Sequence, residues 1–426
     1  MPGHKGKNKL GFEEYDITEI DGADSLYEAS GIIKESEQNA GSLFGCNTFY
    51  STEGSSLCIR AMIYLVALYA KEFKKNPVIA ASRNAHKTFL SAAAMADFDV
   101  QWLYPEEESS YLSCKITAQS LENAINQAEI KPAAVYLTSP DYLGSTADLR
   151  SISDVCRKHG ILLVIDNAHG AYLKFLPESL HPIDLGADMC CDSAHKTLPV
   201  LTGGAYLHIS ENAENILMQN AKNALALFGS TSPSYLILQS LDMANKYISD
   251  GYKENLSGFC KRIRKLKEKL ISHGYTLYGD EPLKITVSTK PYGYRGTEIA
   301  DILAKKNIIC EFCDPDFIVF MLNPETEESE LISFEEAMIS IEQKAEITEK
   351  PPIFAKPETA ISIRAAVFST NETIPANQSC GRILSAANVA CPPAVPIVVC
   401  GERINEKAIR CFEYYGIKEC TIIKGR

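Results

Sequence analysis

From about residue 50 onward, helix-like and strand-like apolar segments follow one another in turn, and this alternation restricts the fold more than any other feature of the sequence. Residues 55–74 are a long apolar segment that begins just after Gly54 and is typical of a buried helix. Short strands that alternate with helices predict an α/β fold built on a three-layer, mostly parallel sheet. The further units that we expect are a strand at 77–81, a helix at 86–96, a strand at 134–137, a helix at 149–158 and a strand at 161–165.

The last third of the chain has a different pattern. Helical segments between residues 211 and 272 lead into separated short strands, and a joint at 350–357 contains proline and lysine. We therefore predict an N-terminal arm at 1–30, a large domain at 31–272 and a smaller α+β domain at 273–426. Within the smaller domain we expect strands at 283–289 and 317–321, a helix at 335–344, a β-rich run at 397–400 and a closing helix at 406–415.

The charge of the chain argues against several kinds of partner. The net charge of −12 disfavours general binding to nucleic acid or to an anionic membrane. The one strongly basic stretch, 261–269, carries apolar residues at helical spacing, so we interpret its charges as the exposed face of an amphipathic helix. The longest apolar run, 61–70, is far shorter than the roughly 20 residues needed to span a bilayer.

The cysteines do not form a recognisable metal or disulfide pattern. Of the 14 cysteines, only Cys310 and Cys313 have CxxC spacing, and no second pair or suitably spaced histidines follow them. Because no signal-peptide pattern is present, we expect reduced thiols, no metal site and a cytoplasmic location.

Three polar segments stand where an α/β sheet places its ligands, beyond the carboxyl ends of the strands. Asp166 directly follows the buried run 161–165, and Lys196 lies in a Ser-Ala-His-Lys-Thr segment after another apolar stretch. Gly54-Ser55-Ser56 opens the long helix, where backbone N–H groups and hydroxyls suit a phosphate. Taken alone, each feature has an ordinary structural explanation, such as a helix cap, a surface lysine or an N-cap serine.

Together these segments match the needs of one cofactor, pyridoxal 5′-phosphate. That cofactor requires a lysine for its aldehyde, a carboxylate beside its ring nitrogen and a cup for its phosphate. The carboxylate keeps the ring nitrogen protonated, so that the ring can accept the electron pair left when a bond at Cα breaks. The sequence therefore predicts a pyridoxal-phosphate enzyme with Lys196 and Asp166 at its centre.

The chain resembles the Orn/Lys/Arg decarboxylase family, in its compact form without the N-terminal wing domain. Six motifs carry the resemblance, and they occur in the family's order over nearly the whole chain. The motifs are Pro2-Gly3-His4-Lys5-Gly6, Arg83-Asn84-Ala85-His86-Lys87, Asp166-Asn167-Ala168-His169-Gly170-Ala171, Ser193-Ala194-His195-Lys196-Thr197-Leu198, Thr231-Ser232-Pro233-Ser234-Tyr235, and Pro392-Pro393-Ala394-Val395-Pro396 with Gly401-Glu402.

The resemblance implies a fold-type I enzyme that decarboxylates arginine, lysine or ornithine as a homodimer or a dimer of dimers. It implies that Lys196 carries the cofactor as a Schiff base, that Asp166 holds the ring nitrogen and that His86 stacks on the ring. It also implies that Lys196 or His195 protonates Cα. The phosphate ligands implied are Ser55, Ser56 and Ser193, with Gly54 and His169 in the same pocket and Thr231 and Ser232 reaching a neighbouring subunit.

Departures from the family pattern leave alternatives open. The tail motifs differ from their usual form, and Glu53 stands where the family commonly has asparagine. We take Glu402, and alternatively Glu53, as the acidic group for the distal cation of a basic substrate. The rivals are an aminotransferase, in which Arg364 would bind the substrate carboxylate, a carbon–sulfur lyase, and a cofactor-binding protein with weakened catalysis.

Overall fold

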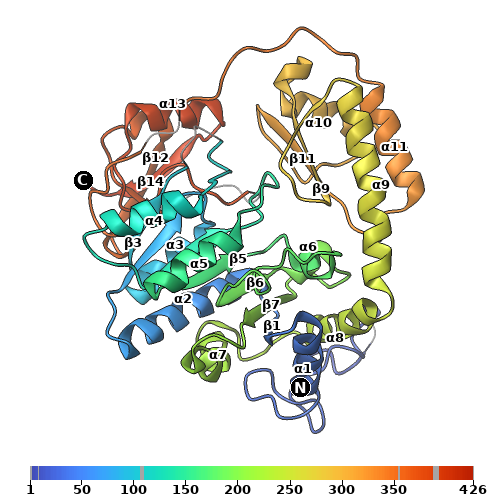
Figure 1. The fold of residues 1–426 in the computed structure, drawn as a ribbon, viewed down its shortest axis with the longest axis vertical. Coiled ribbons are helices and arrows are strands. Elements are labelled where there is room, and N and C mark those ends of the chain that lie inside the picture. Colours follow the sequence, from blue (N-terminus) through green and yellow to red (C-terminus); the bar gives the residue numbers. More distant parts are fainter. Residues whose placement is uncertain (1, 8, 106–109, 354–355, 387–392, 426) are drawn as a thin grey trace.

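A seven-stranded sheet forms the centre of the molecule (Figure 1). The computed structural model describes residues 2–7, 9–105, 110–353, 356–386 and 393–425. The strand order is β1-β7-β6-β5-β4-β2-β3. The strands are β1 (Asn47–Ser51), β2 (Val78–Ser82), β3 (Asp99–Leu103), β4 (Ala134–Thr138), β5 (Leu162–Asp166), β6 (Met189–Asp192) and β7 (Ala205–Ile209).

This sheet is mostly parallel, which confirms the prediction from the alternating units. Strands β6, β5, β4, β2 and β3 pair in parallel, whereas β7 runs antiparallel to both β6 and β1. Every residue of β2 and β5 is buried, as expected for parallel strands covered on both faces. The predicted strands at 77–81, 134–137 and 161–165 agree with β2, β4 and β5 to within one residue at each end.

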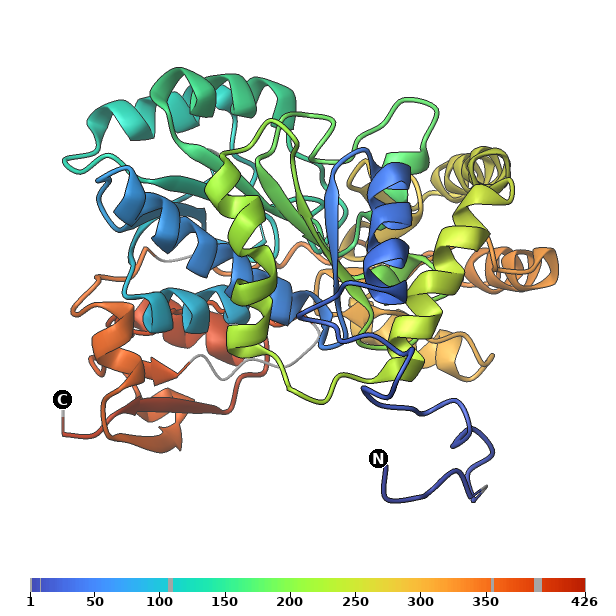
Figure 2. The ribbon, with the colours of Figure 1, turned by 90° about the horizontal axis from the view of Figure 1, so that it is seen from below.

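Helices cover both faces of the sheet and complete the three layers (Figure 2). One face packs against α2 (Gly54–Glu72), α3 (Lys87–Ala96) and α7 (Asn215–Phe228). The other face packs against α1 (Ile32–Phe44), α4 (Ala118–Gln127), α5 (Leu149–His159), α8 (Tyr235–Ser249) and the short helix η1 (Ala171–Phe175). The predicted helices at 55–74, 86–96 and 149–158 correspond to α2, α3 and α5.

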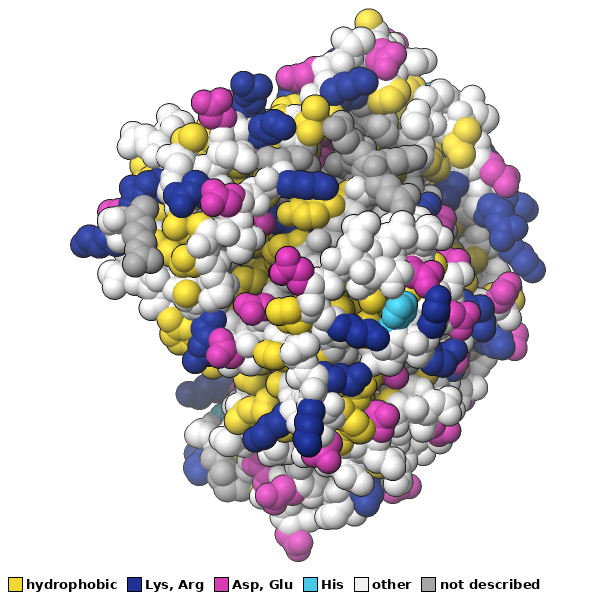
Figure 3. All heavy atoms as spheres, turned by 60° about the vertical axis from the view of Figure 1, so that its left-hand side comes forward, with side chains coloured by type: hydrophobic (Ala, Val, Ile, Leu, Met, Phe, Trp, Pro, Cys, Tyr) yellow, Lys and Arg dark blue, Asp and Glu magenta, His cyan; other side chains and the backbone are white. Residues whose placement is uncertain are grey.

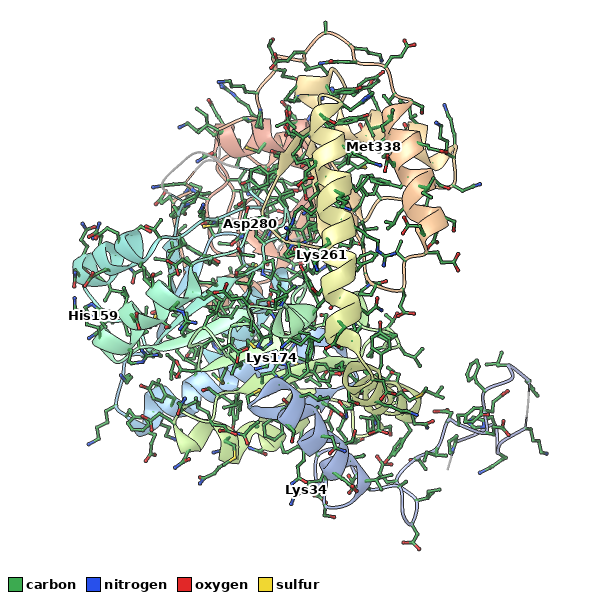
Figure 4. All side chains as sticks on the ribbon, turned by 45° about the vertical axis from the view of Figure 1, so that its right-hand side comes forward. Lys34, His159, Lys174, Lys261, Asp280 and Met338 are labelled. Carbon is green, nitrogen blue, oxygen red and sulfur yellow. The ribbon has the colours of Figure 1, made fainter. Side chains whose placement is uncertain are left out.

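A second, antiparallel sheet follows the long helix α9 (Tyr252–Ser272). Figure 4 shows α9 with Lys261 on it and Met338 of the neighbouring α11 beside it. The apolar face of α9, formed by Phe259, Ile263, Leu266 and Leu270, is buried, which confirms that the basic stretch is the outer face of an amphipathic helix. The sheet order is β10 (Phe312–Cys313), β11 (Phe317–Met321), β9 (Lys284–Ser288) and β8 (Thr276–Tyr278), with helices η2 (Lys290–Tyr292), α10 (Gly296–Ala304) and α11 (Glu328–Ile339).

A third sheet closes the chain at the upper left of Figure 1. Residues 273–426 thus contain two separate sheets, while the proposed domain limits at residues 30 and 272 remain predictions. The closing helix predicted at 406–415 agrees with α13. The elements of this part are α12 (Ile363–Val367), β12 (Asn371–Pro375), η3 (Ala376–Gln378), β13 (Leu384–Ala386), α13 (Glu406–Tyr414) and β14 (Glu419–Ile423), in the sheet order β12-β14-β13.

Of the predictions for the last third of the chain, one helix has the wrong bounds and one strand is wrong. The helix expected at 335–344 is α11, which begins at Glu328 because Glu327 and Glu330 form a capping box there, and it ends at Ile339. The β-rich run expected at 397–400 is a buried loop that pairs with no strand. Burial of an apolar run does not require a strand when its backbone groups find side-chain partners, and here Arg83 binds the carbonyl of Ile397.

The described residues contain no helix that is both long enough and apolar enough to cross a membrane. On the face drawn in Figure 3, basic and acidic side chains are interspersed.

Candidate active site

One cavity brings together the predicted cofactor residues, which come from segments far apart in the sequence. It lies beyond the carboxyl ends of β4, β5 and β6, the edge at which α/β sheets bind ligands. All of the residues predicted to bind the cofactor within one subunit line this cavity, whereas Glu402, the first choice for the substrate, does not. Its walls are Gly54, Ser55, Ser56, Asn84, His86, Thr138, Pro140, Tyr142, Asp166, Ala168, His169, Ser193, His195, Lys196, Glu311, Pro393 and Val395.

Lys196 lies on the short helix α6 (Ala194–Thr197), immediately after the buried end of β6. Its side chain is half-buried, and its Nζ lies 2.7 Å from Nε2 of His169. A lysine amine held inside a cavity is suited to condense with a carbonyl group.

Asp166 is the last residue of β5 and is fully buried against the same cavity. Its Oδ2 accepts a hydrogen bond from the Tyr136 hydroxyl at 3.2 Å, and its Oδ1 accepts one from the Ala168 N–H at 3.2 Å. Burial raises the pKa of this carboxyl. A cationic ring nitrogen at the cavity would compensate the buried negative charge, so Asp166 fits the partner that a pyridinium needs.

The N-terminus of α2 and the segment before Lys196 form a polar cup. Gly54 has a φ of 70°, a left-handed conformation in which a residue with a Cβ is strained. The Ser193 hydroxyl donates to Oγ of Ser55 at 2.9 Å, and Oγ of Ser56 lies 3.3 Å from Oγ1 of Thr88. Hydroxyls grouped at a helix N-terminus suit a phosphate.

Two further histidines line the cavity in their neutral forms. His86 caps α3 by accepting the Thr88 N–H at Nδ1, 3.1 Å away, and burial, followed by the neighbouring basic side chains, lowers its pKa to about 4. His195 lies with its Nδ1 3.0 Å from the carbonyl of Gly204, and burial lowers its pKa although this contact opposes the shift. A neutral imidazole can pack on an aromatic ring or transfer a proton near neutral pH.

The structure also adds lining residues that the sequence did not single out. Glu311 lies just before β10, is exposed, and accepts a hydrogen bond from the Tyr142 hydroxyl at 3.1 Å. It stands between the two cysteines of the CxxC motif, Cys310 and Cys313. Tyr142 also packs edge-on against His169. No local pattern marks Glu311, because it reaches the cavity from the second sheet.

The residues suggested for the substrate, and two suggested for a neighbouring subunit's phosphate, do not line the cavity. Glu402 is buried against Arg83, with Oε2 2.9 Å from Nη2, so its carboxylate is engaged in an ion pair. Glu53 points to the N–H of Ser230, which it accepts at 2.6 Å, and away from the cup. Arg364 donates to the carbonyl of Ala94 at 2.8 Å. Thr231 and Ser232 are exposed, and Pro392 lies outside the described residues.

A buried network supports the cavity from behind. Asp192, next to Ser193, accepts a hydrogen bond from the Asn167 amide at 2.6 Å, and Nε2 of His181 lies 3.0 Å from its Oδ2. Burial alone would raise the pKa of Asp192, but His181 and His208 hold it well below its ordinary value. Within the described part of the chain, His181, Cys190 and Asp192 lie close enough to hold a metal ion. The predicted absence of a metal stays a prediction.

The sequence matches families of decarboxylases, in agreement with the cofactor residues found in the cavity. Residues 6–286 match the family model described as Orn/Lys/Arg decarboxylase, major domain, and residues 341–421 match its C-terminal domain. Among curated relatives, the arginine decarboxylase of Bacillus subtilis is 27% identical, over 96% of this chain and 88% of the relative. The uncharacterized protein YaaO of the same organism is 28% identical, over 93% of this chain and 84% of that protein.

Solved structures show the same fold. The Francisella novicida lysine decarboxylase LdcF superposes with a TM-score of 0.79 over 100% of this chain and 78% of that chain, at 16% identity. The constitutive lysine decarboxylase of Escherichia coli gives a TM-score of 0.72 over 100% and 79%, also at 16% identity. Both family models match in chain order, and the first alone covers more than half of the sequence. The chain therefore belongs to the Orn/Lys/Arg decarboxylase family of pyridoxal-phosphate-dependent amino-acid decarboxylases.

Proposed function

We propose that this protein decarboxylates a basic amino acid, with pyridoxal 5′-phosphate as its cofactor. The observation that carries the proposal is the meeting of Lys196, buried Asp166 and the Gly54-Ser55-Ser56 cup in one cavity. These residues supply an amine, a carboxylate and a set of phosphate donors, which is the donor set that the cofactor requires. The residues present therefore fit the cofactor.

Each residue has a distinct task in this proposal. Lys196 provides the amine that holds the cofactor, and Asp166 keeps a proton on the ring nitrogen. Ser55, Ser56 and Ser193 bind the phosphate, and the neutral ring of His86 packs against the cofactor. When bound, the cofactor supplies a conjugated ring that accepts the electron pair released as the bond between Cα and the carboxylate breaks. Lys196 or His195 then delivers a proton to Cα.

The position of Glu311 supports a basic substrate. Apart from buried Asp166, Glu311 is the only carboxylate among the described residues of the cavity wall, and it is exposed. An exposed carboxylate at a cavity attracts the distal ammonium or guanidinium of lysine, ornithine or arginine. We therefore assign to Glu311 the role that the sequence suggested for Glu402. The B. subtilis relative is named an arginine decarboxylase.

The aminotransferase alternative lacks its key residue. Arg364 would have to bind the substrate carboxylate, but it bonds to the carbonyl of Ala94 on α3 and is absent from the described cavity wall. The oligomer stays a proposal: a homodimer would allow the exposed Thr231 and Ser232 to reach a neighbouring subunit's phosphate.

The experiment compares arginine, lysine and ornithine with norleucine, which has an apolar side chain of similar length. We expect amine formation from at least one basic amino acid and none from norleucine. Glu311→Gln should raise the KM for that substrate by roughly 10-fold or more, since one charged hydrogen bond contributes about 1.5–3 kcal/mol. Formation of a keto acid without CO2 would refute decarboxylation.

A further inference from the structure

His169 lies between two lysines, one on each side of its ring. Its Nε2 is 2.7 Å from Nζ of Lys196, and its Nδ1 is 3.0 Å from Nζ of Lys284, the first residue of β9. A neutral imidazole has one nitrogen that donates and one that accepts. The two lysines therefore cannot both donate a hydrogen bond to His169, and they cannot both accept one from it.

The surroundings of Lys284 decide which lysine donates. Its side chain is buried, and its Nζ lies 2.9 Å from Oε2 of Glu281 and 3.2 Å from the carbonyl of Asp141. The contact with Glu281 is an ion pair, while the Asp141 carbonyl and Nδ1 of His169 are acceptors for N–H groups of the ammonium. A neutral Lys284 would deprive the buried Glu281 carboxylate of the cation that lies 2.9 Å from its Oε2, which is costly. Lys284 is therefore the protonated lysine and donates to Nδ1.

The proton on His169 is then fixed at Nε2. Because Nδ1 accepts from Lys284, Nε2 carries the hydrogen and donates it toward Lys196, whose nitrogen must accept through its lone pair. Burial first, and then the charge of Lys284, hold the pKa of His169 well below its ordinary value, so the ring does not become doubly protonated. Other titratable groups near His169 and Lys196 are His86 and His195, whose pKa values are also lowered, and Asp166. Near Lys284 they are Asp141, whose pKa burial raises to about 6, and Lys267, whose pKa burial lowers.

We propose that Lys284 is a positioning residue that fixes the tautomer of His169 and thereby keeps Lys196 in its unprotonated, reactive form. The proposal rests on the proposed function in one respect, namely that Lys196 is the reactive amine. Only an unprotonated amine attacks a carbonyl or takes up a proton, so the contact prepares Lys196 for both tasks. Glu281 completes the arrangement, and the Tyr172 hydroxyl donates to its other oxygen at 3.1 Å.

The test follows the reactivity of Lys196 in the full-length, cofactor-free protein. Formaldehyde and cyanoborohydride methylate unprotonated lysines, and mass spectrometry of the peptide that contains Lys196 gives the extent of labelling at each pH. We expect the midpoint pH of labelling to rise by about 1 unit in Lys284→Met. The substitution removes the neighbouring positive charge, and it also removes the hydrogen bond to Nδ1 that keeps the proton of His169 on Nε2. Lys284→Arg keeps the charge and a donor, and should restore the wild-type midpoint.

Two controls separate positioning from loss of structure. Lys290 forms a comparable buried ion pair, with Nζ 2.8 Å from Oδ1 of Asp316, so Lys290→Met should leave the Lys196 midpoint unchanged. If Lys284→Met does not fold, His169→Leu replaces it and should raise the midpoint in the same way.

An unchanged midpoint in the folded variant, or an equal shift in Lys290→Met, would overturn the proposal. The readout requires neither bound cofactor nor turnover. Failure of the decarboxylase assay would therefore not affect the labelling result. An unchanged labelling midpoint would likewise not contradict decarboxylation.

Discussion

Arg83 and Glu402 form a buried ion pair, with Nη2 2.9 Å from Oε2, that joins the end of β2 to the C-terminal tail. Arg83 also donates to the carbonyls of Pro396 and Ile397. The tail residues Pro393 and Val395 line the cavity, so this pair holds part of the cavity wall in place. The tail motif that the sequence suggested for substrate binding thus has a structural role.

Breaking this pair should destabilise the protein. Glu402→Gln leaves the Arg83 charge buried without its partner, and we expect the free energy of unfolding to fall by about 3–5 kcal/mol. Urea denaturation measures the change. Arg157 and Asp154 form an ion pair at 3.0 Å with both side chains largely exposed, so Asp154→Asn should change stability by about 1 kcal/mol or less. Equal effects of the two substitutions would contradict the assigned role of Glu402.

Ser193 and Ser55 should bind the cofactor phosphate. Ser193→Ala removes one hydroxyl from the cup, and we expect the Kd for pyridoxal phosphate to rise roughly 10-fold, equivalent to one charge-assisted hydrogen bond. Fluorescence titration of the cofactor-free protein gives the Kd. Ser91 lies on α3, bonds to the carbonyl of Thr88 and is absent from the described cavity wall, so Ser91→Ala should leave the Kd unchanged. An unaltered Kd in Ser193→Ala would remove this residue from the cup.

His86 should make the protein sensitive to acid. Its pKa is lowered from 6.5 to about 4, so the neutral form is favoured in the folded state. The resulting stabilisation is complete above the unfolded value of 6.5 and is lost as the pH falls toward 4. His86→Asn keeps an acceptor for the Thr88 N–H but does not titrate, so its stability should fall less steeply over this range. Thermal unfolding across the range checks this, and an unchanged slope would count against it.

Asp192 should stabilise the network behind the cavity. Because the folded-state pKa is held below the ordinary value of 3.8, the carboxylate contributes stability above that pH and loses it as the pH falls through the folded value. Asp192→Asn should lower the unfolding free energy at neutral pH by about 3 kcal/mol, by loss of a buried charge partner. The difference from wild type should shrink below about pH 4, where the unfolded carboxyl is protonated. A constant difference at every pH would contradict the account.

The sequence predicted the sheet and the cofactor residues because both depend on local patterns. Each residue that lines the cavity as predicted follows a buried strand or opens a helix, and strand ends meet at one edge of a parallel sheet. Lys196 and Asp166 could therefore be placed together from sequence alone.

The remaining site residues depend on long-range packing. Glu311 reaches the cavity from the second sheet. For Lys284 the sequence predicted only a position in a strand, whereas its contacts with His169 and Glu281 indicate that it is protonated. The buried run at 397–400 was wrongly predicted to be a strand, because its apolar composition does not reveal that Arg83 and Glu402 bind its backbone. Pairings between residues hundreds of positions apart leave no periodic signal in the chain.

The most direct test of the central claim is the release of CO2 from carboxyl-labelled arginine, lysine and ornithine by the protein supplied with pyridoxal phosphate. We predict that at least one of them yields CO2 and the corresponding amine in equal amounts, and that Lys196→Ala abolishes both products. No CO2 from any of the three substrates, or undiminished release by Lys196→Ala, would contradict the account.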